Sequence, residues 1–151
     1  MSSWGGVVLI AGITAVVMCV GGWEERRRLR KKYWWRMCTG LQWRERFPEA
    51  PKEDIREFLR EFTEAFGFGK KRALKFAPDD KIGEIYRTRY PTAGLPDRLE
   101  MVDFALMLER RYGVDMTGRW REDVTLGDIF AMTQEKGRAG VECRAGGTVS
   151  S

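Results

Sequence analysis

The sequence is poor in the residues from which most enzyme active sites are built. Its 151 residues include no histidine, so the commonest general base and the commonest metal ligand are both absent. The four serines are Ser2, Ser3, Ser150 and Ser151, and with no histidine a Ser-His-Asp site is excluded. The three cysteines, at positions 19, 38 and 143, are too few for a structural zinc site and odd in number for a disulfide framework. These absences predict a protein that is not an enzyme and binds no metal.

Charge is distributed unevenly along the chain. Residues 1–23 carry no charged side chain, whereas residues 24–47 hold nine Lys or Arg against three Glu. Residues 48–151 hold eighteen basic against nineteen acidic side chains. The overall excess of +5 therefore comes from one short segment.

The uncharged segment has the length and composition of a membrane span. Twenty residues from Trp4 to Trp23 cover the roughly 30 Å of a bilayer core as a helix, and tryptophan is typical of both headgroup levels. A cleaved signal peptide is the alternative, but no Lys or Arg precedes the apolar run. We therefore predict a single-pass anchor over residues 1–23. Basic residues directly after it place the C-terminal domain in the cytoplasm.

A stripe of small residues within this span bears on oligomeric state. Ala11, Ala15 and Cys19 recur every four residues, a spacing that lets two membrane helices approach closely. It is compatible with a homodimer, although small residues are also common in membrane helices in general.

Residues 24–47 form a basic and aromatic segment beside the predicted anchor. Its cations attract anionic lipid headgroups, and Tyr33, Trp34, Trp35 and Trp43 are residue types found at the interface. The predicted headgroup contacts are Arg26, Arg27, Arg28, Arg30, Lys31 and Lys32. Binding of single-stranded nucleic acid is the alternative for a basic, aromatic segment, and the adjoining anchor favours lipid.

Residues 48–137 have the pattern of a small helical bundle. Ile55, Phe58, Leu59, Phe62 and Phe66 form one apolar stripe, which predicts a helix from Pro51 to a stop at Gly67 and Gly69. Residues 70–90 are expected to be a long connection in which a short turn directs Ile82, Ile85 and Tyr86 inward. A last helix begins after Thr125, with Asp128 completing its cap, and residues 138–151 are expected to be a disordered tail.

A further helix is predicted from Asp97 to its end at Gly113, and it is apolar on more than one face. Leu99, Val102, Leu106 and, further on, Tyr112 are predicted to supply its core face. Its other apolar residues, including Met101, Phe104 and Met107, then form a candidate docking face or fill the core as well.

This helix and its downstream partner resemble a known family. The stretch DRLEMVDFALMLERRYGVDM at 97–116 is similar to the helix that bears the prosthetic group in acyl carrier proteins, and VTLGDIF at 124–130 resembles the start of their last helix. The similarity covers about 51–136 and implies an all-α fold, a carrier-like four-helix bundle behind the N-terminal transmembrane helix.

The attachment point of that family is missing. In acyl carrier proteins a serine after the aspartate receives 4′-phosphopantetheine, and Arg98 stands at this position. A guanidinium has no hydroxyl to esterify, so no cofactor is expected. Arg98 then either binds an acidic partner or is an incidental surface residue.

The sequence thus predicts a non-catalytic, membrane-tethered protein-interaction module. Its candidate docking face consists of Asp97, Arg98, Met101, Phe104 and Met107. The alternative is a non-covalent binder of an apolar ligand or acyl chain within the bundle. A carrier modified at another residue is a remote third reading.

Overall fold

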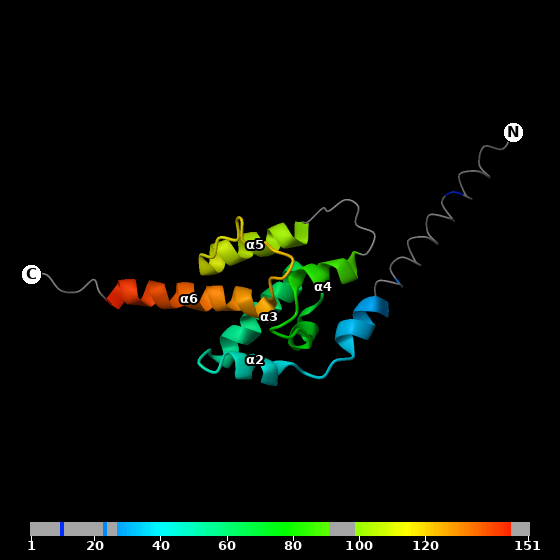
Figure 1. The fold of residues 1–151 in the computed structure, drawn as a ribbon, viewed down its shortest axis with the longest axis horizontal. Coiled ribbons are helices and arrows are strands. Elements are labelled where there is room, and N and C mark those ends of the chain that lie inside the picture. Colours follow the sequence, from blue (N-terminus) through cyan, green and yellow to red (C-terminus); the bar gives the residue numbers. More distant parts are fainter. Residues whose placement is uncertain (1–9, 11–22, 24–26, 91–98, 146–151) are drawn as a thin grey trace, which may run out of the picture.

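The structure is a computed structural model that describes residues 27–90 and 99–145, together with Ile10 and Trp23. All its elements in these ranges are helical, so the predicted all-α class is confirmed there (Figure 1). The elements in chain order are η1 (Arg30–Trp34), α2 (Gly40–Arg46), α3 (Lys52–Ala65), η2 (Lys70–Lys75), α4 (Ile82–Arg89), α5 (Leu99–Tyr112) and α6 (Leu126–Ala145).

The predicted membrane span falls almost entirely outside the described residues. Only Ile10 and Trp23 of residues 1–23 are described, and the stripe of Ala11, Ala15 and Cys19 is not. Within the described ranges, every helix is too short or too polar to cross a bilayer.

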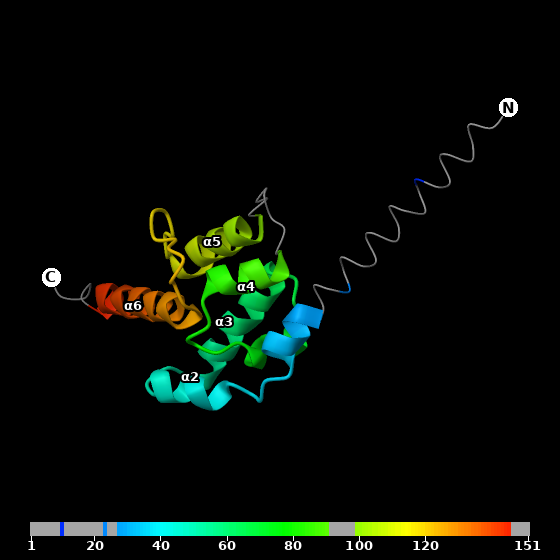
Figure 2. The same ribbon diagram turned by 45° about the vertical axis from the view of Figure 1, so that its right-hand side comes forward.

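Helix α3 lies at the centre and follows the prediction closely. Its whole predicted stripe is buried, and it lies between α2 on one side and α4 and α5 on the other (Figures 1 and 2). The helix ends where Gly67 adopts a φ of 62°, a left-handed conformation that favours glycine. The N–H of Phe68 then bonds to the carbonyl of Thr63 at 2.8 Å, which closes the C-terminus.

The connection after α3 is more ordered than expected. It contains η2 and the eight-residue helix α4, whose Ile82 and Ile85 are buried as predicted. The start of α4 is tied to the start of α6, because the N–H of Ile82 bonds to the carbonyl of Val124 at 3.1 Å and that of Leu126 to Asp80 at 3.0 Å. Two segments far apart in the sequence are thereby fixed side by side.

The core face of α5 differs from the prediction. Phe104 and Leu108 are buried, whereas Leu99, Val102 and Leu106 are exposed. The buried stripe is completed by Met101, Ala105 and Tyr112, which pack against the core, and of these Tyr112 was predicted to do so. Its spacing is the same as that of the α3 stripe, so two helices with matching stripes pack together and the surplus apolar residues of α5 face outward.

Helix α6 begins as predicted but runs further. The N–H of Thr125 bonds to the Asp128 carboxylate at 3.0 Å, and the N–H of Asp128 bonds to the Thr125 hydroxyl at 3.1 Å, which confirms the cap. The helix continues to Ala145, so the prediction of a disordered tail is wrong for residues 138–145. Extending a helix that is already nucleated needs little packing, because propagation costs far less than nucleation.

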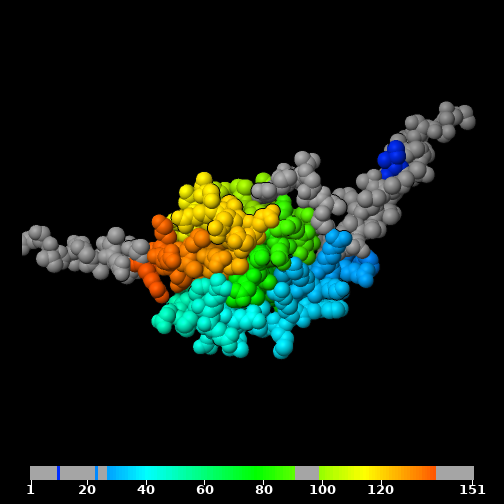
Figure 3. Space-filling view, viewed as in Figure 1, coloured from blue at the N-terminus to red at the C-terminus, as the bar shows by residue number. Residues whose placement is uncertain are grey.

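The predicted boundary between a juxtamembrane segment and a bundle at residues 47 and 48 is also wrong. Leu29, Tyr33 and Trp43 belong to the same buried core as α3, α4, α5 and α6. In Figure 3 the atoms of residues 27–47 lie directly against those of residues 70–90. Large aromatic side chains bury much apolar area in a core, and the buried indole N–H of Trp43 has a hydrogen-bond partner there in the carbonyl of Phe76.

Candidate functional site

Among the described residues, α5 carries more exposed large apolar side chains than any other helix. Leu99, Val102 and Leu106 are 61%, 51% and 40% exposed and recur at spacings of three and four residues. Such spacing places the three side chains along one side of the helix. A contiguous row of this kind is typical of an interaction surface.

A groove of about 450 Å³ runs beside this row, between α5 and the segment that follows it. Val102 and Leu106 line it together with Met101, Met116 and Trp120. Sequence analysis missed Met116 and Trp120, because both lie in a connection with no helical period.

The wall opposite α5 is built by two turns. Gly113 has a φ of 66° and ends α5, and the N–H of Val114 then bonds to the carbonyl of Leu108 at 3.2 Å. Further on, the Asp115 carboxylate accepts the N–H of Thr117 at 2.7 Å and Gly118 has a φ of 71°. These turns hold residues 114–120 against α5 as a defined surface.

The five residues of the predicted docking face have different positions in the structure. Asp97 and Arg98, and with them the lost attachment position, lie outside the described residues. Met101 lines the groove, and Met107 lines a shallower hollow beside it with Arg110. Phe104 is fully buried among Phe58, Phe62 and Phe66, so its assignment to a docking face was wrong.

The charged residues that line the groove are both acidic. Glu109 and Asp115 stand on its rim, and no Lys or Arg is among its lining residues. The nearby Arg111 is directed to α3, where it pairs with Glu57 and, at 2.7 Å, with Glu61. The groove therefore presents an apolar floor with negative charge at its edge.

The end of α5 is fixed to α3 by a partly buried polar contact. The Tyr112 hydroxyl donates to the Glu61 carboxylate at 2.9 Å. Burial raises the pKa of Glu61, against the effects of Tyr112 and Arg111. Burial and the bond to Glu61 also raise the pKa of Tyr112, so its hydroxyl stays a donor at neutral pH.

The predicted headgroup contacts are mostly exposed. Arg27, Arg28, Arg30 and Lys31 face solvent, and Arg26 lies outside the described residues. Lys32 bonds to Glu84 on α4 at 2.9 Å, which raises the pKa of the lysine and lowers that of the glutamate.

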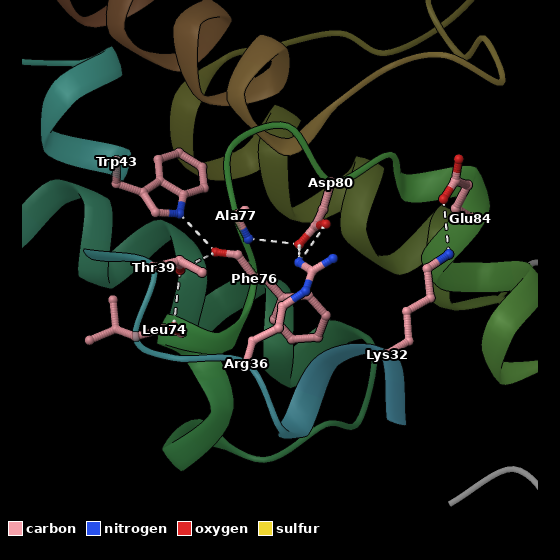
Figure 4. A network of polar contacts seen from close by, with 9 residues as sticks. All are labelled: Lys32, Arg36, Thr39, Trp43, Leu74, Phe76, Ala77, Asp80 and Glu84. Carbon is pink, nitrogen blue, oxygen red and sulfur yellow. Dashed lines mark hydrogen bonds and ion pairs between the residues drawn. The ribbon is translucent and has the colours of Figure 1, made fainter. Parts of the chain in front are cut away.

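A polar network fastens the basic segment to the bundle (Figure 4). Arg36 donates to both oxygens of the Asp80 carboxylate at 2.7 Å, and Asp80 also accepts the N–H of Ala77 at 2.7 Å. The indole N–H of Trp43 donates to the carbonyl of Phe76 at 2.8 Å.

Thr39 completes this network from the loop before α2. Its backbone N–H bonds to the carbonyl of Leu74 at 2.9 Å, and its hydroxyl lies 2.7 Å from the carbonyl of Phe76. The sequence offered one signal for this packing, because Leu29 and Tyr33 are four residues apart, as are Trp43 and Phe47.

A second hollow has a volume of about 560 Å³. It lies between α3 and α6, and its lining includes Asp54, Glu57, Gln134 and Arg138. Within the described ranges, no three Cys, Asp or Glu side chains are grouped closely enough to hold a metal ion.

No protein-family model, curated protein or solved structure matches the chain. The assignment of function therefore rests on the residues and geometry described above.

Proposed function

We propose that this protein is a non-catalytic, membrane-tethered interaction module that docks a partner protein on the exposed face of α5. The observation that carries the proposal is the row of Leu99, Val102 and Leu106 beside a groove with an apolar floor. Single exposed apolar side chains are common on protein surfaces, whereas these three lie together on one helix face. Their exposure is explained if another protein covers them.

The chemistry of the groove selects a class of partner. Glu109 and Asp115 on the rim favour Lys or Arg on the partner, and the apolar floor favours a helix with an apolar stripe. We therefore propose a basic amphipathic helix as the docked element. Anchoring both proteins in one membrane would raise their effective concentration, so that a modest affinity suffices.

The tether and the fold family are parts of the same proposal. The tether is supported by the uncharged stretch from Trp4 to Trp23 and by the exposed cations after it, which favour a cytoplasmic bundle. A carrier-like bundle is supported by the motifs in α5 and at the start of α6. Phosphopantetheine attachment is not expected, because Arg98 has no hydroxyl to esterify.

Binding of an apolar ligand or acyl chain is the alternative function. The space between α3 and α5 is filled by aromatic rings, with Phe62 and Phe104 at 5.5 Å and Phe58 and Phe104 at 6.1 Å between ring centroids. A chain inside the bundle would have to displace these rings. The α5 groove, whose volume is in the range of small-molecule sites, is the better place for such a ligand.

Site-specific photo-cross-linking in native membranes tests the proposal. A benzophenone side chain is placed at position 106, and the matched control carries it at Arg56, which is also exposed but lies on α3. We expect one protein to be captured from position 106 and not from position 56. Its captured segment should be an amphipathic helix with Lys or Arg, and Val102→Glu should abolish capture while Val102→Ile preserves it.

Other outcomes assign other functions. Capture of the chain itself would indicate a homodimer. If no protein is captured and native mass spectrometry finds a bound small molecule, the ligand alternative is correct. Equal capture from both positions, insensitive to Val102→Glu, would contradict docking on α5.

A further inference from the structure

A second group of exposed apolar side chains lies on the segment from the end of η1 to the first turn of α2. Trp35, Met37 and Leu41 are 76%, 88% and 69% exposed. Among the described residues, the exposed large apolar side chains lie on α5, at these three positions, or at Ile10 and Trp23 in the predicted span. The second group is therefore the one nearest in sequence to the predicted membrane anchor.

These side chains are held outward by their neighbours. Tyr33, Thr39 and Trp43 are buried and flank the exposed residues along the segment. Thr39 and Trp43 bond to the main chain of η2 and Phe76, so the segment cannot rotate to bury the exposed set (Figure 4). Exposure of these residues is thus imposed by the packing of the bundle.

The surroundings of Trp35 are cationic. Trp35 lines a groove of about 520 Å³ with Trp23, Arg27, Arg30 and Lys31. The chain has no Asp or Glu between residues 26 and 44. A surface that combines exposed tryptophan and aliphatic side chains with this charge is complementary to an anionic bilayer, where the rings sit at the headgroup level.

We infer that Trp35, Met37 and Leu41 insert into an anionic bilayer surface and seat the bundle directly on the membrane, with Arg27, Arg30 and Lys31 at the headgroups. This inference rests on the tether of the proposed function and deepens it, because the bundle is then held at the membrane in a fixed orientation. The inference does not depend on whether a partner protein docks on α5.

Cys38 allows a direct test, because it is exposed and lies beside Met37. The full chain with Cys19→Ser and Cys143→Ser is labelled at Cys38 with an environment-sensitive fluorophore. It is reconstituted into phosphatidylcholine vesicles with and without phosphatidylglycerol. In a matched control, Cys38→Ser and Thr117→Cys move the label to an exposed turn in the connection between α5 and α6.

With phosphatidylglycerol present, we expect blue-shifted emission at Cys38 and iodide quenching several-fold weaker than at position 117. Replacing Trp35 and Leu41 by serine should restore quenching. Because both side chains are exposed, the helical content should not change. Equal quenching at both labels would overturn the inference.

Vesicle flotation separates this outcome from failure of the tether. Protein that floats with both kinds of vesicle while Cys38 stays quenched supports the tether and contradicts the seating surface. Protein that floats only with anionic vesicles, with Cys38 shielded, contradicts the tether and supports the seating surface. Protein that floats with neither contradicts both.

Discussion

Replacing Asp80 by asparagine should destabilise the whole bundle, because Asp80 joins the basic segment to it. Its carboxylate is only 10% exposed and accepts two bonds from Arg36 and one from Ala77. Asparagine keeps the shape but loses the charge, and it turns an amide donor toward the guanidinium. A hydrogen bond to a charged group contributes about 1.5–3 kcal/mol, and Arg36 remains partly hydrated, so we expect a loss of about 2 kcal/mol.

The matched control is Glu84→Gln. Glu84 also bonds to the basic segment, through Lys32, but both side chains are more than 40% exposed. An exposed pair of this kind is worth about 0.2–1 kcal/mol. The structure therefore predicts a clearly larger effect at Asp80 than at Glu84.

The assay is urea unfolding of the full-length protein in detergent, followed by circular dichroism. Asp80→Asn should lower the midpoint without changing the slope. A double-mutant cycle with Arg36→Gln should show coupling between the two side chains. Unfolding of Asp80→Asn at the wild-type midpoint would refute the reasoning, because the segment would then not be part of the cooperative unit.

Two further predictions concern α6. Gly127→Ala should destabilise the protein, because its Cβ would lie 2.9 Å from the carbonyl oxygen of Pro78. Gly137→Ala should stabilise the protein by up to about 1 kcal/mol, because that helical position is open. Thermal unfolding compares the two variants, and a loss of stability on Gly137→Ala would contradict a helix at that position. Asp128→Asn should cost about 0.5–1 kcal/mol at neutral pH, since the carboxylate lies in the first turn of α6. Burial acts to raise the pKa of Asp128, but bonds from Thr125 and the charge of Arg46 outweigh it and lower this pKa below the ordinary 3.8. The carboxylate therefore contributes its full stabilisation at pH values well above 3.8 and loses it as the pH falls through the lower pKa of the folded state. The difference in stability between wild type and Asp128→Asn should accordingly disappear in acid. A difference that stays constant with pH would show that the charge is not involved.

The parts of the fold that were predicted correctly each depend on one unambiguous local signal. Helix α3 has a single apolar stripe and a glycine stop, and α6 has a capping box made by Thr125 and Asp128. In both cases local chemistry and tertiary packing favour the same structure.

The parts that were missed depend on tertiary packing. Helix α5 has two apolar sets, and only contact with α3 decides that Phe104 faces inward and Leu106 outward. Tyr33 and Trp43 are residue types common both at membranes and in cores. They are buried here because both contact Phe76 and because Arg36 pairs with Asp80, and these partners lie more than thirty residues away in the sequence. The groove residues were likewise only partly predicted. Trp120 lines the groove because turns in the connection after α5 bring it back against that helix.

Hydrogen exchange of the full-length protein in lipid nanodiscs tests most directly whether the basic segment is part of the bundle. The N–H groups of Thr39, Trp43 and Phe47 bond to Leu74, Thr39 and Trp43. We predict that the peptide covering residues 39–47 exchanges as slowly as the peptides of α3, because both then open only when the bundle unfolds. Exchange of residues 39–47 at the rate of an unstructured linker, with α3 protected, would contradict the account.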